Sequence, residues 1–140
     1  MGRTILGAAV GLVLAVATIM LVELAGHQVY PPPPGLDPMV TADMVQILQT
    51  MPLGAMLFVV AAWVIGAFDG GFVAALVAGK GGHPRAAAIV PALMVMAGVV
   101  AMVVQMPAHP TWMAIAGLLL PIPAAVAGAL LAGKVAAARR

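Results

Sequence analysis

The side chains that could do chemistry are few, and the densest group of them lies in the stretch ELAGHQVYPPPPGLD, residues 23–37. Glu23 and His27 are four residues apart, so a helix that continues through both would place them on one face. There they could form an ion pair, a proton relay or half of a metal site. The structural alternative is a carboxylate near the end of its helix that the histidine caps, and the residues alone leave both alternatives open.

Asp69 is the second candidate, because it lies within a long apolar segment and shares its depth with no Lys, Arg or His. Counting back from Lys80 at about 1.5 Å per residue places Asp69 about 15 Å from the basic end of that segment. We hypothesise that Asp69 is the central protonatable or ion-binding group, with Thr18 about one turn away in depth. The alternative is a protonated acid that is hydrogen-bonded to a neighbouring backbone carbonyl.

Two prolines could complete such an ion site. A faint repeat relates residues 74–80 (AALVAGK) to residues 128–134 (GALLAGK), and its offset pairs Asp69 with Pro123. Pro121 and Pro123 each remove a helical hydrogen bond, which frees two backbone carbonyls in the preceding turn. A carboxyl opposite freed carbonyls could bind a proton or a small cation, as broken helices do in transporters.

Other kinds of chemistry find no support in the sequence. The chain has no cysteine, so disulfides and thiolate metal sites are excluded. It has no serine and carries none of the G-x-S-x-G, H-E-x-x-H or P-loop motifs. We therefore expect a protein that is not an enzyme, has no catalytic residues, and uses no metal or other cofactor. No basic cluster is dense enough to indicate nucleic-acid binding.

The elements that must position these residues are membrane helices. The 140 residues are 64% hydrophobic and only 7% charged, against about 25% charged in soluble domains. A span needs roughly 20 mostly apolar residues, and in lipid it must be helical to satisfy its own backbone. We predict one all-α domain over residues 1–140, a four-helix membrane bundle with spans at about 4–26, 52–79, 86–106 and 112–133.

The basic residues predict the orientation of these spans. All of them fall at the N-terminus, between the second and third spans, or at the C-terminus, which share one side of a four-span protein. By the positive-inside rule that side is cytoplasmic, so we expect a multi-pass protein of the cell inner membrane with both termini inside. The basic residues are Arg3, Lys80, Arg85, Lys134, Arg139 and Arg140.

The Pro-rich stretch is then part of an outer segment, residues 27–51. We expect Gly26 to cap the first helix and the four prolines to form a stiff polyproline II strut. Residues 41–51 show apolar residues at helical spacing, with Thr41 as the expected N-cap. They predict a short amphipathic helix that lies on the outer membrane surface.

Small residues four apart predict how the helices pack. Close backbone contact in lipid uses such stripes, either within one chain or between copies, and sequence does not separate these two uses. With only four spans we expect a stripe to serve a partner, in a homo-oligomer or a larger membrane complex within the lipid bilayer, and we expect self-association through the stripe on the second span. The second span carries Ala62, Gly66, Gly70, Ala74 and Ala78; the first carries Gly7 and Gly11; the fourth carries Ala124, Gly128 and Ala132.

The first half of the chain resembles a group of bacterial membrane proteins. Glu23 and His27, then YPPPPGLD, MPLGAM and a tryptophan before GAFDGGFVAA, resemble small four-helix membrane proteins of uncharacterised function. The resemblance covers the first two spans and their loop, and it implies no activity. Small multidrug-resistance transporters share the chain's size, span count and a glutamate in the first helix. Their glutamate lies deep in the membrane, whereas Glu23 lies near a helix end.

These observations leave three classes of function. One is an oligomeric transporter or channel with a buried acidic site. Another is a non-catalytic structural or accessory subunit of a larger membrane assembly. The third is a lipid- or metal-handling protein. A polar cavity at the centre of the membrane would favour the first, and a dry core with an exposed stripe of small residues would favour the second. The candidate ion- or proton-binding residues are Asp69, Glu23, His27 and Thr18, and the packing residues are Gly66, Gly70, Ala74, Pro121 and Pro123.

Overall fold

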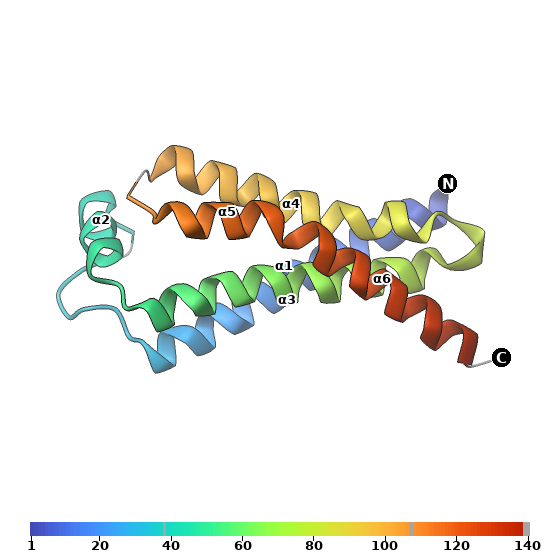
Figure 1. Ribbon diagram of the computed structural model, residues 1–140, viewed down its shortest axis with the longest axis horizontal. Helices are drawn as coiled ribbons and strands as arrows, with labels where there is room; N and C mark the ends of the chain where they lie inside the picture. The colour runs from blue at the N-terminus through green and yellow to red at the C-terminus, as the bar shows by residue number, and fades with distance from the viewer. Residues whose placement is uncertain (38, 107, 139–140) are drawn as a thin grey trace.

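The fold is all-α, with four helical segments long and apolar enough to cross a membrane (Figure 1). This confirms the fold class predicted from the sequence. The computed structural model describes residues 1–37, 39–106 and 108–138. Its elements are α1 (Gly2–Val29), α2 (Thr41–Thr50), α3 (Leu53–Ala78), the short 3-10 turn η1 (Gly79–Gly81), α4 (Pro84–Gln105), α5 (Thr111–Leu119) and α6 (Pro121–Ala138).

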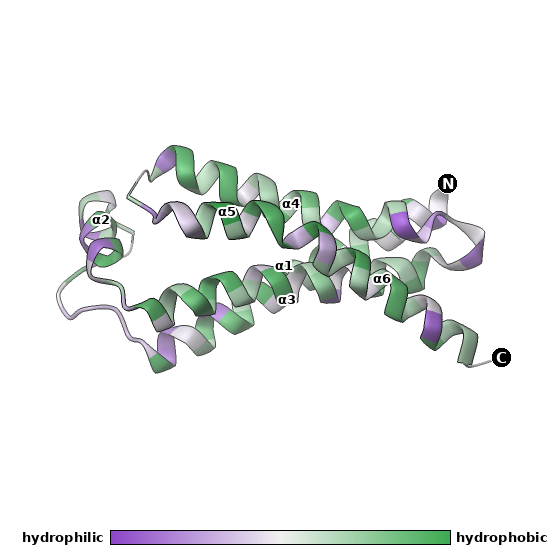
Figure 2. Ribbon diagram, in the orientation of Figure 1, coloured by the Kyte–Doolittle hydropathy of each residue, from purple (hydrophilic) through white to green (hydrophobic). Residues whose placement is uncertain are grey.

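Hydropathy follows this architecture. Figure 2 shows apolar residues along the length of α1, α3, α4, α5 and α6, with hydrophilic residues mainly at the two ends of the bundle. The fold therefore defines a small multi-pass membrane protein.

The connection between α3 and α4 is fixed to α1, because the backbone N–H of His83 donates to the Thr4 hydroxyl at 2.9 Å.

The fourth span is broken, although a single helix was expected there. The α5 segment ends with the N–H of Leu120 donating to the carbonyl of Ala116 at 2.9 Å, and α6 begins at Pro121. Proline has no N–H to donate and its ring crowds the preceding turn, so the helix changes direction there. In Figure 1, α5 runs beside α4, whereas α6 crosses the bundle and its C-terminal end turns away from the other helices.

One half of the bundle, towards η1, packs through alanine and glycine. A Cβ built on Gly70 would lie 2.7 Å from the Gly11 carbonyl and 2.8 Å from the Cβ of Ala15, so α1 and α3 touch through their backbones. Gly7 lies equally close to Ala74. The stripe on α3, expected to face a partner copy, is instead buried against α1 of the same chain.

The other half of the bundle, towards α2, packs through large side chains. Trp63, Val99 and Met113 are buried together there. A Cβ on Gly117 would lie 2.7 Å from both Trp63 and Val99, so this glycine makes the room that the indole ring occupies. Large side chains hold helices farther apart than alanine does, and Figure 1 shows the α4–α5 pair diverging from the α1–α3 pair towards α2.

The outer segment contains the expected short helix, but its caps differ from the prediction. Thr41 is the first helical residue of α2 rather than its N-cap, and Val40 precedes it without a side-chain cap. The turn before α2 is held by carboxylates instead. Asp43 accepts the backbone N–H of Asp37 at 3.0 Å, and Asp37 accepts the N–H of Met39 at 2.9 Å.

Candidate functional site

A cavity of about 490 Å³ lies at the end of the bundle that carries the proline run. It is enclosed by the C-terminal part of α1, the prolines 31–34, the end of α2 and the first turns of α3. Glu23 and His27 contribute a carboxylate and an imidazole, and Tyr30 and Thr50 contribute hydroxyl groups. Ile47, Phe58 and Val59 are among the apolar residues that make up most of the remaining wall.

Glu23 and His27 share this cavity because α1 does not end at Gly26. The helix continues to Val29, and the N–H of Tyr30 still donates to the Gly26 carbonyl at 2.8 Å. Gly26 is buried, and a Cβ there would lie 3.1 Å from the Cβ of Phe58. The expectation that Gly26 caps the helix is therefore wrong: its missing side chain is used for close packing against α3.

The histidine bonds to backbone rather than to the glutamate side chain. His27 Nδ1 lies 2.8 Å from the Glu23 carbonyl oxygen, one helical turn back. A carbonyl only accepts, so Nδ1 carries the hydrogen in this contact. The carboxylate of Glu23, which is half-buried, is thus left for another partner in the cavity.

Aromatic rings fix one side of the cavity. Tyr30 and Phe58 meet edge to face, with ring centroids 6.0 Å apart and an interplanar angle of 67°. Gly54 makes this possible, since a Cβ there would collide with the Tyr30 hydroxyl. Sequence analysis missed Tyr30, Gly54 and Phe58 as site residues. The available signal was a glycine one helical turn before a phenylalanine, at the start of a span.

Asp69 lies elsewhere, halfway along α3. The Thr18 hydroxyl of α1 donates to its carboxylate at 3.5 Å, and both side chains are half-buried. The repeat offset does match in depth, because Gly71 lies against Ala125 on α6. Asp69 is two residues from Gly71, however, about 200° around the helix. The hydrogen-bond partner of its carboxyl is Thr18 on α1, and a position of Asp69 opposite the freed carbonyls stays a prediction.

The structure thus separates the predicted ion-binding residues into two groups. Thr18 and Glu23 are five residues apart on α1, which is about 7.5 Å along the axis and about 140° around it. Glu23 and His27 line the cavity, whereas Asp69 and Thr18 contact each other at another depth of the α1–α3 pair and do not line it. Of the predicted packing residues, Pro121 is buried at the start of α6 and Pro123 is exposed.

No three His, Asp or Glu side chains of the described residues come close enough together to hold a metal ion. No protein-family model, no curated protein and no solved structure matches the chain. The resemblance to small four-helix bacterial membrane proteins therefore depends on the quoted residues alone. The functional argument has to come from the cavity and the acids themselves.

Proposed function

We propose that this multi-pass membrane protein transports a small amphipathic organic cation, which binds in the cavity beside Glu23. The observation that carries the proposal is a half-buried carboxylate in a cavity of about 490 Å³ with aromatic and proline walls. Small-molecule sites typically measure about 300–1,000 Å³, are mainly apolar and hold a few polar groups.

Each part of the cavity suits one part of such a ligand. A carboxylate away from bulk water attracts a cation more strongly than an exposed one does. The rings of Tyr30 and Phe58 add cation–π attraction for an organic ammonium group. Ile47, Val59 and the prolines supply apolar surface for hydrocarbon groups. An inorganic ion has no hydrocarbon groups, so this apolar surface would not contribute to its binding free energy.

Asp69 is proposed as the protonatable group of the transport cycle. It is an acid within a membrane-spanning helix, and such residues most often serve ion or proton pathways. Its hydroxyl partner Thr18 can donate to the charged carboxylate. Because Asp69 and Glu23 lie apart, the proposal gives ligand binding and proton coupling to different residues, and the two roles can be tested separately.

A second candidate function is a non-catalytic accessory subunit of an oligomer or a larger membrane complex. It is favoured by the surroundings of Asp69, because Ile65 and Leu76 on the same side of α3 are 42% and 38% exposed. A half-buried acid on the lateral surface of a span would be better accommodated against another protein helix than against lipid.

The binding proposal is tested with benzyltrimethylammonium and its neutral isostere neopentylbenzene, by calorimetric titration of the protein in detergent micelles. The Glu23→Gln substitution should weaken binding of the cation at least tenfold, which corresponds to about 1.4 kcal/mol. It should leave the neutral compound unaffected.

Asp37→Asn is the matched control, because Asp37 lies at the same end but does not line the cavity. Its backbone partner Met39 can still donate to an asparagine oxygen. An equal loss of cation binding in both variants would show a general charge effect, and no loss in Glu23→Gln would refute the proposed site.

A further inference from the structure

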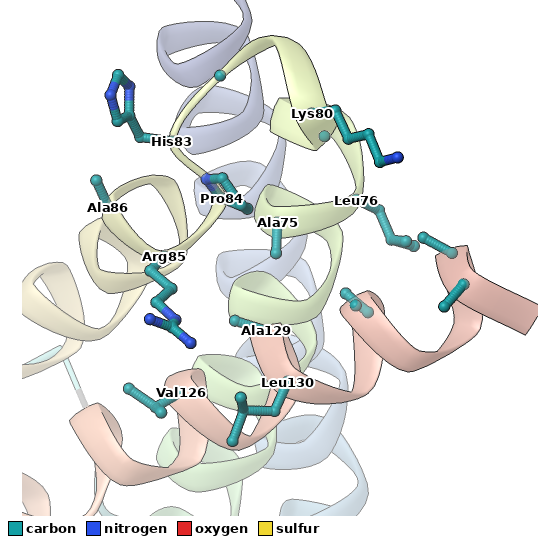
Figure 3. Close-up of a pocket in the computed structure, with 16 residues that line it drawn as sticks. Ala75, Leu76, Lys80, His83, Pro84, Arg85, Ala86, Val126, Ala129 and Leu130 are labelled. Atoms are coloured by element: carbon teal, nitrogen blue, oxygen red, sulfur yellow. The ribbon is translucent and has the colours of Figure 1, made fainter.

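A second and larger cavity, of about 1250 Å³, opens at the opposite end of the bundle. It lies between the end of α3, the connection to α4, the first turn of α4 and the C-terminal half of α6 (Figure 3). Its volume exceeds the roughly 300–1,000 Å³ of ordinary small-molecule sites. It shares no residue with the cavity beside Glu23.

The cavity exists because of the proline break and the small residues beyond it. After Pro121, α6 crosses the bundle, and its C-terminal end turns away from the other helices, as Figure 1 shows. The facing surfaces of α3 and α6 carry Ala75, Ala132 and Gly133, whose side chains are too small to fill the space. A Cβ built on Gly133 would meet nothing within 4 Å.

The cavity combines basic side chains from the end of α3 and the start of α4 with an apolar surface on α6. In Figure 3 the guanidinium of Arg85 points towards Val126 and Leu130 of α6, Lys80 stands on the far side of the cavity, and His83 points away from it. Val126 and Leu130, both on a membrane-spanning segment, are 37% and 51% exposed.

No side-chain carboxylate of the chain is placed to neutralise these cations. The four acids are Glu23, Asp37, Asp43 and Asp69, and none of them lines this cavity. The first three lie at or near the opposite end, and Asp69 lies halfway along α3 with Thr18 as its partner. The exposed cations of this cavity are therefore open to a negatively charged group from outside the chain.

We propose that this cavity binds one anionic phospholipid. The headgroup phosphate binds the Arg85 guanidinium, with Lys80 adding positive charge at the rim of the cavity, and an acyl chain covers Leu76, Val126 and Leu130. A guanidinium matches two phosphate oxygens at once, and basic cavities between membrane helices bind anionic headgroups. The exposed apolar surface requires hydrocarbon, which a soluble phosphate does not offer.

Native mass spectrometry of the purified protein, with phosphatidylglycerol or phosphatidylcholine added to the detergent, tests the proposal. The wild type should retain one phosphatidylglycerol in preference to phosphatidylcholine. Arg85→Gln should reduce that preference about fivefold, as expected for one cation near a lipid headgroup. Gly133→Phe should abolish retention by filling the cavity, without loss of folding, because the glycine has open space beside it.

Two matched controls distinguish the cavity from general effects. Lys134→Gln removes a charge at the same end outside the cavity lining, and Gly98→Phe adds the same side chain at another glycine with open space. Both should retain the lipid. Equal retention of the two lipids, or an unchanged preference in Arg85→Gln, would overturn the proposal.

A competition experiment distinguishes a bound lipid from other possible occupants of the cavity. Soluble glycerol 3-phosphate should not compete with phosphatidylglycerol at equal concentration, and full competition would indicate a simple anion site instead. Loss of a dimer in Gly133→Phe, with lipid retention unchanged, would assign the cavity to a second copy of the chain.

Discussion

Glu23 and Asp69 are the same kind of group in two different surroundings. Glu23 lines a cavity whose other walls are rings and aliphatic side chains, and the nearby imidazole bonds to backbone instead of to the carboxylate. Asp69 has a single hydroxyl partner at 3.5 Å and lines neither of the two large cavities. At the scale of single residues, Glu23 therefore lies in a space that a ligand could enter, whereas Asp69 contacts a neighbouring helix.

Asp69→Asn should separate these roles. Asparagine keeps the shape and can still accept the Thr18 hydroxyl, but it cannot take up or release a proton. We expect binding of benzyltrimethylammonium in detergent to change less than about twofold, within ordinary surface effects. We expect its uptake into proteoliposomes under a proton gradient to fall at least tenfold, or about 1.4 kcal/mol in activation free energy.

Thr18→Ser is the control for that experiment, because it preserves the hydroxyl and should retain uptake. Full uptake by Asp69→Asn would leave Asp69 as a packing residue. Dissociation of an oligomer in the variant, with the protomer still folded, would favour the accessory-subunit function.

At the scale of elements, α1 and α3 are held by backbone contact. Gly11, Ala15 and Gly70 meet where no side chain would fit, and the Cβ of Pro91 from α4 would lie 3.0 Å from a Cβ on Gly70. Lipid gives no hydrophobic drive to helix association, so such close packing carries much of the stability. We therefore expect substitutions in this contact to lower the stability of the single protomer rather than only to weaken the association of protomers.

Gly70→Leu should therefore lower the free energy of unfolding by about 1–3 kcal/mol or more, because overpacking forces the helices apart. Thermal unfolding in detergent, followed by circular dichroism, measures the change. Gly98→Leu makes the same substitution on α4 at a glycine with no neighbour within 4 Å, and should unfold at or above the wild-type temperature. A Gly70→Leu protein with wild-type stability that only loses cross-linked dimers would place the stripe between copies.

At the scale of the whole molecule, the two ends of the bundle differ in charge and in the kind of cavity they hold. The end at η1 has Arg3, Lys80 and Arg85, and the end at α2 has Asp37 and Asp43. By the positive-inside rule, we expect the η1 end to face the cytoplasm and the proline run to lie outside. The cation proposed to bind beside Glu23 would then enter from outside.

Single-cysteine labelling in intact cells tests this orientation, and the chain has no cysteine of its own. Met39, which is 91% exposed, and Gly81 in the connection to α4 are suitable positions. A membrane-impermeant maleimide should label Met39→Cys in intact cells and Gly81→Cys only after lysis. The opposite pattern would invert the protein in the membrane.

Sequence by itself determined the properties that depend on composition and depth. Apolar length predicted the four spans, and the helical spacing after Thr41 predicted α2. The count of residues from Lys80 placed Asp69 well inside its span and about one turn from Thr18 in depth, and the two side chains do meet in the structure. These follow from the fixed rise of a helix and the fixed thickness of lipid, which require no knowledge of neighbouring helices.

Only the tertiary structure decided which neighbour each face meets. Gly26 has the residue type of a helix cap, but Phe58 packs against it and the helix continues. The small-residue stripe on α3 has a defined face, but only packing shows that α1 of the same chain covers it. Asp69 has the predicted depth, but the direction in which its side chain points depends on how α1 and α3 are rotated against each other. Periodicity along one helix does not contain that rotation, so the cavity beside Glu23 and the cavity beside Arg85 became visible only in the folded chain.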